Sequence, residues 1–210
     1  MRAHSNPSMP DRPFGLLLVE GGDERAVCEA VVGPAAWASL CCWNVQGRDK
    51  LVRVARAARL DPNFTFARSI GVVLDVENNL ADALALAVNS LAIFGFASTL
   101  VHGALSAGSP RLGAFLVPDG SAHGCIETLC RCAVRDPSLA TCVDALAACA
   151  GFPHASLANA QANADKGWLK AYLGMLADPT LRFHQALSTP GGIDPTHAAL
   201  DPLRTFLLAL

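Results

Sequence analysis

The sequence predicts a Rossmann-like α/β fold, in which a mainly parallel sheet is flanked by helices and followed by a C-terminal helical extension. Two observations carry this prediction. Short apolar runs that each lead to a carboxylate alternate with segments of helical periodicity over the first 120 residues. These runs lack the polar–apolar alternation of a half-exposed strand, which indicates strands buried on both faces of a parallel sheet.

We expect three segments along the chain. Residues 1–13 carry three prolines and no apolar stretch, which predicts a flexible lead rather than a signal peptide. Residues 14–134 contain the strands and form the α/β core, whereas residues 135–210 are predicted to be helical. We expect these helices to pack on the core rather than to form an independent domain.

The first unit of the core is a strand, a tight turn of two glycines and a helix. Residues 15–19 form the strand, Glu20 ends it, and the helix spans residues 23–32. Asp23 and Glu24 suit the positive end of the helix dipole, but Glu20 comes too early to cap the helix. Because open α/β sheets bind ligands beyond the carboxyl ends of their strands, Glu20 is the first candidate functional residue.

The second unit pairs a strand over residues 40–47 with a basic helix over residues 48–59. Five Arg and Lys residues of this helix are predicted to face outward, and a solvated surface is their ordinary explanation. Contact with phosphate is the alternative. Arg48 and Lys50 follow the strand closely enough to reach a substrate at the carboxyl edge of the sheet.

The third strand, over residues 70–74, runs directly into Asp75 and Glu77, and an apolar helix follows at residues 80–94. Residues i and i+2 of an extended segment point the same way. We therefore expect the carboxylates of Asp75 and Glu77 to reach one point in space.

The rest of the chain contributes one further core strand and several helices. A short strand is possible at residues 98–102, and the segment 112–120 forms the next strand, which ends on Asp119. Helices are expected over residues 125–134, 138–150, 155–176 and 201–209.

Carboxylates at the ends of several strands predict a metal centre. Ordinary acidic strand ends explain any one of Glu20, Asp75 and Glu77, but that explanation is strained for all of them together. Hard oxygen ligands that converge at a sheet edge suit Mg²⁺ or Mn²⁺, with waters or phosphate oxygens completing the coordination.

The order of these motifs resembles the Toprim (topoisomerase–primase) family. The matching residues are Val19-Glu20-Gly21 and the strand-borne Asp75-Val76-Glu77. The later Pro118-Asp119-Gly120, followed by Ile126-Glu127, is similar to a small group of stand-alone Toprim-related proteins, distantly similar to nuclease domains of the OLD (overcoming lysogenization defect) type. The resemblance spans about residues 14–130 and implies a Toprim-type sheet with a divalent-metal site.

The resemblance also implies roles for individual residues. Glu20 would be a general acid/base or a metal ligand, and Asp75 and Glu77 would be metal ligands. Glu24, or alternatively Asp23, matches the additional acid of OLD-type relatives, and Asp119 completes the expected metal set. The implied activity is metal-dependent phosphodiester hydrolysis or phosphoryl transfer, nuclease-type on nucleic acid or another phosphate-containing ligand.

Topoisomerase activity is not expected, because the sole tyrosine, Tyr172, lies in the helical tail. Primase activity is not expected either, because no primase or helicase module is recognised in the sequence. His123, in the loop after Asp119, is a possible substrate contact or a surface histidine. Glu127 is a fourth acid of the site or an ordinary charge at a helix start. Lys166, in the helical tail, is interpreted as a solvated lysine, with phosphate binding as the alternative.

Composition limits the partners. The chain has 210 residues, 52% hydrophobic and 16% charged, and a formal net charge of −2. A charged fraction below the average of about 25% favours a partner or a second copy over part of the apolar surface, so a homo-oligomer is one expectation. The charge counts against the footprint of a strongly basic nucleic-acid binder. No apolar run approaches the roughly 20 residues that a membrane span requires.

The eight cysteines include no CxxC pair. Cys125, Cys130 and Cys132 are crowded enough for structural zinc, but a helix would point Cys130 and Cys132 to different faces. We interpret the cysteines as buried small residues of a reducing, cytoplasmic protein.

Three functions compete at this stage. The first is a metal-dependent nuclease or phosphoryl-transfer enzyme. The second is a metal- or nucleotide-binding regulatory module without catalysis, and the third is an enzyme that acts on a small phosphorylated substrate. A positive track beside Glu20 and Asp75 would favour the first over the other two.

Overall fold

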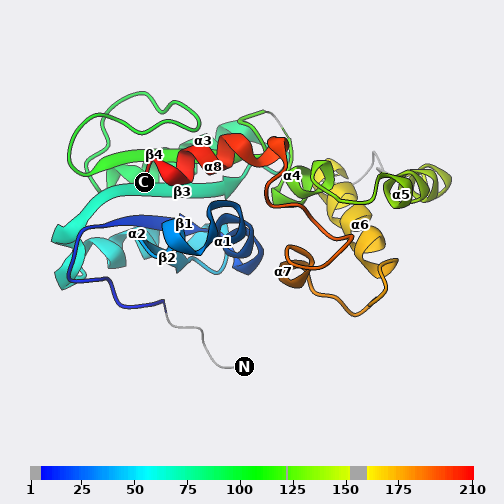
Figure 1. Cartoon of the computed structure of the whole chain (residues 1–210). Coiled ribbons are helices and arrows are strands. Elements are labelled where there is room, and N and C mark those ends of the chain that lie inside the picture. Colours follow the sequence, from blue (N-terminus) through cyan, green and yellow to red (C-terminus); the bar gives the residue numbers. More distant parts are fainter. Residues whose placement is uncertain (1–5, 122, 152–159) are drawn as a thin grey trace.

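A four-stranded, all-parallel sheet forms the centre of the computed structural model, which describes residues 6–121, 123–151 and 160–210 (Figure 1). The strand order is β2-β1-β3-β4. The strands are β1 (Phe14–Val19), β2 (Leu40–Asn44), β3 (Ala67–Asp75) and β4 (Arg111–Val117). The predicted α/β class with a mainly parallel sheet is confirmed.

Helices cover both faces of this sheet. Two buried clusters form around alternate residues of β1: Leu16 and Leu18 belong to one, and Leu17 and Val19 to the other. The first cluster is covered by α2 (Leu51–Arg59) and α3 (Leu80–Ala92), and the second by α1 (Gly22–Trp37) and α8 (Asp201–Leu208). Burial on both faces explains why the strand sequences are apolar without alternation.

A glycine break and short 3₁₀ turns interrupt or precede several of the helices. Gly33 has a φ of 73°, which interrupts α1 directly after residue 32, where the predicted helix ends. The predicted helix over residues 48–59 begins as a 3₁₀ turn, η1 (Arg48–Lys50), before α2. Two further 3₁₀ turns are η2 (Pro62–Phe66) and η3 (Ala198–Leu200).

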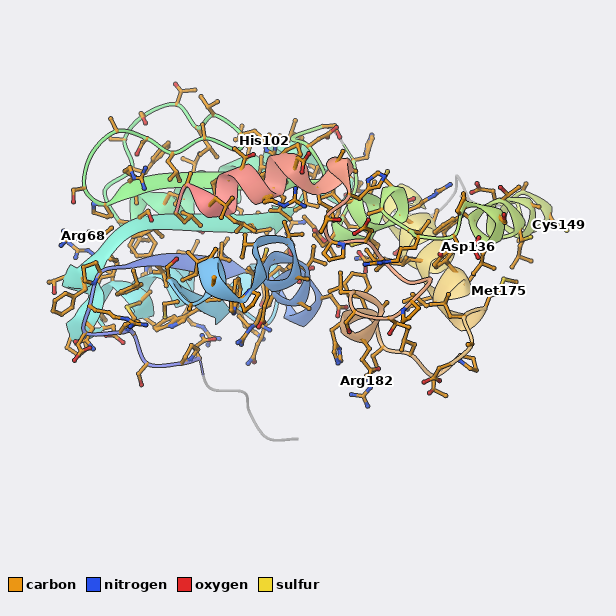
Figure 2. The ribbon with its side chains drawn as sticks, viewed as in Figure 1. Arg68, His102, Asp136, Cys149, Met175 and Arg182 are labelled. Atoms are coloured by element: carbon orange, nitrogen blue, oxygen red, sulfur yellow. The ribbon has the colours of Figure 1, made fainter. Side chains whose placement is uncertain are left out.

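The possible strand at residues 98–102 is wrong. This segment belongs to a loop that follows the free edge of β4, where Gly103 N donates to Ala114 O (2.9 Å) and Leu116 N donates to His102 Nδ1 (3.1 Å). Figure 2 labels His102. Gly103 has a φ of 69°, outside the range of extended backbone, so the loop covers the edge without forming a regular strand.

A helical lobe lies beyond the carboxyl ends of the strands (Figure 1). It contains α4 (Ile126–Cys132), α5 (Pro137–Cys149), α6 (Ala160–Gly174) and α7 (Phe183–Ala186). Trp168 and Tyr172 of α6 share one buried cluster with Leu17 and Phe115 of the sheet, so the apolar core continues from the sheet into the lobe. The first part of the expected helix at 155–176 lies outside the described residues, and α7 was not predicted.

The cysteines are all free thiols. Cys28, Cys41, Cys42, Cys125 and Cys130 are buried as expected, whereas Cys132, Cys142 and Cys149 are exposed, which corrects the prediction for these three. Figure 2 shows Cys149 at the outer end of the lobe. Among the described residues, no helix is both long enough and apolar enough to span a membrane.

Candidate metal centre

The carboxyl ends of β1 and β3 meet at the centre of the sheet. Strands β2 and β3 are both neighbours of β1, so the chain leaves β1 and β2 in opposite directions and creates a topological switch point. Glu20 directly follows β1, and Asp75 is the last residue of β3. Glu20 and Asp75 therefore lie at the edge of the sheet where open α/β sheets bind ligands.

An open cleft of about 380 Å³ lies at this point. Its wall carries five acids and one base. The lining residues are Glu20, Gly21, Gly22, Asp23, Glu24, Asn44, Gln46, Gly47, Asp75, Glu127 and Lys166.

The turn between β1 and α1 leaves room for the Glu24 carboxylate in the wall of the cleft. Glu24 lies in the first turn of α1 and is 8% exposed. A Cβ atom added to Gly21 would lie 2.8 Å from Glu24 Oε2. Glycine at position 21 therefore leaves the space that the Glu24 carboxylate occupies.

Two carboxylate oxygens in this cleft are buried without a partner. Glu20 Oε2 and Glu127 Oε2 are inaccessible to solvent and accept no hydrogen bond from any described residue. Buried oxygens of this kind are costly, and an ion or a water at the site is their usual explanation. The residues present therefore fit a cation.

Crowding of the acids changes their protonation. Burial raises the pKa of Asp75 well above its ordinary value, and the carboxylates of Glu24, Glu20 and Glu127 raise it further. Burial also raises the pKa of Glu20, and it raises the pKa of Glu24 to about 7. A divalent cation favours the charged form of each carboxylate. A cation bound among these acids would therefore stabilise their ionised forms.

Lys166 of α6 lines the cleft, which the sequence offered as the alternative to a solvated lysine. Its Nζ lies 3.5 Å from Glu77 Oε1, and Arg48 Nη1 lies 3.7 Å from Glu77 Oε2. Burial lowers the pKa of Lys166, but the carboxylates of Glu127 and Asp75 contribute to a larger opposing effect, so its pKa is raised. No local motif marks this lysine, because its position depends on how the lobe packs against the sheet.

The prediction that Asp75 and Glu77 point the same way assumed an extended backbone, and this assumption is wrong. Glu77 has a φ of 57°, so residues 75–77 do not continue as an extended strand. Its backbone pairs instead with Gly124, with Glu77 N donating to Gly124 O at 2.6 Å. Asp75 lines the cleft, whereas the Glu77 carboxylate lies between Arg48 and Lys166.

Four other candidates do not line the cleft: Arg48, which lies beside Glu77, and Lys50, Asp119 and His123. Asp119 is exposed, and hydrogen bonds from Ser121 lower the pKa of its carboxyl. Lys50 Nζ donates to the carbonyl of Gln46 at 2.7 Å, and His123 is exposed. Glu127 does line the cleft, from the first turn of α4.

A cysteine joins the acids at the inner end of the site. One ligand atom each from Asp75, Cys125 and Glu127 lies within 4.8 Å of the other two. Asp75 Oδ1 also accepts a hydrogen bond from Ile126 N at 3.0 Å, which ties the end of β3 to α4. Sequence spacing could not identify this group, because its members come from a strand and a separate helical segment.

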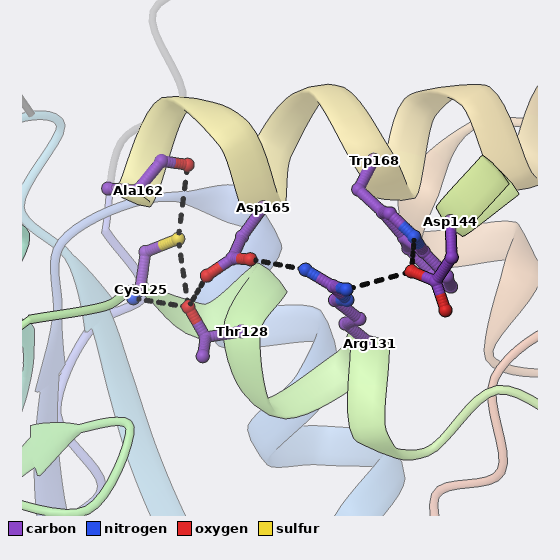
Figure 3. Close-up of polar contacts among 7 residues, drawn as sticks. All are labelled: Cys125, Thr128, Arg131, Asp144, Ala162, Asp165 and Trp168. Carbon is purple, nitrogen blue, oxygen red and sulfur yellow. Dashed lines mark hydrogen bonds and ion pairs between the residues drawn. The ribbon is translucent and has the colours of Figure 1, made fainter. Parts of the chain in front are cut away.

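A polar network supports the site from the lobe (Figure 3). The buried carboxylate of Asp165 accepts a hydrogen bond from Thr128 Oγ1 at 2.6 Å and pairs with Arg131 Nη1 at 3.1 Å. Arg131 also lies over the Trp168 ring and pairs with Asp144 at 2.9 Å. These contacts join α4 to α6, and so fix the helices that carry Glu127 and Lys166.

Comparison with known proteins gives one family and one structural likeness. The family model described as "Protein of unknown function (DUF3226)" matches residues 15–210. The solved C-terminal region of the Xanthomonas campestris pv. campestris OLD protein is similar over 94% of this chain and 95% of that chain, with 16% identity and a TM-score of 0.44. This likeness is too distant to bear on function. No curated protein matches the chain.

Proposed function

The chain belongs to the DUF3226 family, and we propose that it is a divalent-metal-dependent enzyme that hydrolyses phosphodiesters or transfers phosphoryl groups, with nucleic acid as its substrate class. One observation carries the proposal: two carboxylate oxygens, Glu20 Oε2 and Glu127 Oε2, are buried without a partner among the described residues in an acidic cleft. The Toprim-like order of Glu20, Asp75 and Glu77 supports the same chemistry.

Mg²⁺ or Mn²⁺ would take its oxygen ligands from Glu20, Glu24, Asp75 and Glu127, which line one cleft. Of these, Asp75 and Glu127 each place a carboxylate oxygen within 4.8 Å of the other. When bound, the cation polarises a phosphate and favours deprotonation of a water. The acids outnumber the single lysine in the cleft wall, so the cleft favours a cation before it favours a phosphate.

Glu20 and Lys166 would contribute the remaining chemistry. The pKa of Glu20 is raised by burial, so this carboxylate is a better proton acceptor than an exposed one and suits a general base. The ammonium of Lys166 lines the same cleft and can contact a phosphate oxygen. Arg48, held beside Glu77, can contact the next phosphate along a chain.

The competing function is a metal- or nucleotide-binding module without catalysis. One observation favours it: Arg48 and Lys166 are both paired with Glu77, which reduces the positive charge available to a polyanion. Catalysis is therefore the point that an experiment must decide.

The test is cleavage of labelled DNA and RNA, single- and double-stranded, with Mg²⁺ or Mn²⁺. We expect the wild type to cleave at least one of them, and Glu20→Gln to lower the rate by about 100-fold or more. Asp119→Asn, which changes an exposed acid outside the cleft, is the matched control and should stay within about twofold. Metal binding by the wild type without cleavage of any substrate would support the non-catalytic module instead.

A further inference from the structure

Cys125 places a sulfur atom beside two of the acids that line the cleft, Asp75 and Glu127. Its side chain is fully buried, and its Sγ lies within 4.8 Å of a carboxylate oxygen from Asp75 and another from Glu127. Among the described residues, this is the one such grouping of three cysteine, histidine or acidic side chains. The group mixes one soft donor with two hard donors, which an all-carboxylate magnesium site does not require.

Surrounding contacts hold the thiol in place. The backbone N of Cys125 donates to Thr128 Oγ1 at 3.0 Å, and its S–H donates to Ala162 O at 3.8 Å. Thr128 in turn donates to Asp165, whose other oxygen pairs with Arg131 (Figure 3). The hydrogen bond from Cys125 N to Thr128 Oγ1 does not use the thiol proton, so it remains when the sulfur is a thiolate, and metal ligands in proteins are oriented by second contacts of this kind.

The two acids of the group are prepared in different ways. Asp75 Oδ1 accepts the hydrogen bond from Ile126 N, which fixes the orientation of its carboxylate. Glu127 Oε2 is buried and accepts no hydrogen bond from a described residue, so this oxygen remains free to bind a cation. Three side-chain donors are the number that the protein supplies to zinc at sites where a water or a substrate is the fourth ligand.

We propose that Asp75, Cys125 and Glu127 form a metal position that prefers a thiophilic divalent cation, with Zn²⁺ as the representative ion, and that this ion competes with Mg²⁺ for the cleft. The inference rests on the proposed function, because it assumes that the cleft binds metal. Zinc accepts thiolate and carboxylate ligands together, whereas Mg²⁺ strongly prefers oxygen. Binding releases the thiol proton to solvent, because the thiolate is the ligand form of cysteine. Zinc bound here would inhibit a magnesium-dependent reaction by occupying Asp75 and Glu127.

The test uses Co²⁺ as a spectroscopic substitute for zinc. The wild-type protein should develop the near-ultraviolet charge-transfer absorption of a thiolate bound to cobalt, and Zn²⁺ should remove it. Cys125→Ser should lack this absorption and should bind Zn²⁺ at least about 10-fold more weakly, with Mg²⁺ affinity changed by less than about threefold. Cys142→Ser, which alters an exposed thiol on α5, is the matched control and should behave as the wild type.

The outcomes separate this inference from the proposed function. Cobalt binding without the thiolate absorption, or an absorption that survives in Cys125→Ser, would overturn the sulfur ligand and leave the carboxylate centre intact. Failure of Co²⁺, Zn²⁺ and Mg²⁺ all to bind would overturn both. If Cys125→Ser does not fold, zinc X-ray absorption on the wild type decides: we expect one sulfur at about 2.3 Å, and a shell of oxygen and nitrogen alone would contradict the inference.

Discussion

Two groups of buried carboxylates lie close together in this molecule and differ in how they are satisfied. In the lobe, Asp165 is 1% exposed, and both of its oxygens have partners, Thr128 and Arg131. In the cleft, Glu20 and Glu127 each keep one buried oxygen without a hydrogen bond from the described residues.

The same short helix, α4, contributes to both groups. Thr128 and Arg131 satisfy Asp165, whereas Glu127 lines the cleft. Burial of an acid therefore does not by itself indicate a functional site. A buried acid whose partners lie within the protein holds elements together, and one without such partners indicates a ligand.

The largest loss of stability should come from disrupting the contacts of Asp165, whose two carboxylate oxygens both have partners. Arg131→Ala leaves the Asp165 carboxylate buried without its cation, and we expect it to lower the free energy of unfolding by about 3–5 kcal/mol. Denaturant unfolding measures this change. Arg135→Ala removes a more exposed ion pair, with Asp194 at 3.6 Å, and should cost no more than about 1 kcal/mol. Equal losses in the two variants would contradict the role given to Asp165.

A smaller effect of pH should come from Glu24. Its pKa of about 7 in the folded protein lies above the ordinary value of 4.5, so the folded state keeps a proton that the unfolded state has released between these values. The contribution of Glu24 to the free energy of unfolding is therefore fully present below pH 4.5. It is lost as the pH rises towards 7, by about 2–3 kcal/mol without metal.

Glu24→Gln isolates this contribution. The difference in unfolding free energy between wild type and variant, measured from pH 4.5 to 8, should change by that amount. Added Mn²⁺ should reduce the change, because a cation favours the charged carboxylate. A difference that does not vary with pH would mean that Glu24 is not held in a proton-retaining environment.

The smallest effect has the opposite sign to the first. Asp75→Asn removes a charge crowded by other acids but keeps an oxygen that can accept the hydrogen bond from Ile126 N. Without metal, we expect this variant to be as stable as the wild type, or more stable by about 1 kcal/mol, at pH 8. Thermal or denaturant unfolding provides the measurement. A loss of several kcal/mol would place Asp75 with Asp165 as a structural acid.

The sequence predicted the parts of this arrangement that depend on local pattern. Apolar runs predicted the core strands. Because Glu20 and Asp75 end two of these runs, the pattern also marked them as candidates for one site. Asp119 shows the limit of that rule: β4 is separated from β1 by β3, and Asp119 is exposed outside the cleft.

Other features depended on contacts that no local pattern records. The left-handed backbone of Glu77 arises where its segment pairs with Gly124, which lies much later in the chain. Lys166 lines the cleft, and Cys125 lies beside Asp75 and Glu127, because α4 and α6 are joined through Asp165. Such placements follow from tertiary packing, so composition and periodicity could not supply them.

We expect Glu20 and Glu127, each with one buried oxygen that has no partner among the described residues, to bind a divalent cation. Calorimetric titration with Mn²⁺ decides this, using the wild type, Glu20→Gln, Glu127→Gln and the control Asp144→Asn, which alters an exposed acid already paired with Arg131. We predict binding by the wild type and the control, and affinity at least about 10-fold weaker in both cleft variants. No binding by the wild type, or equal binding by all four proteins, would contradict the claim.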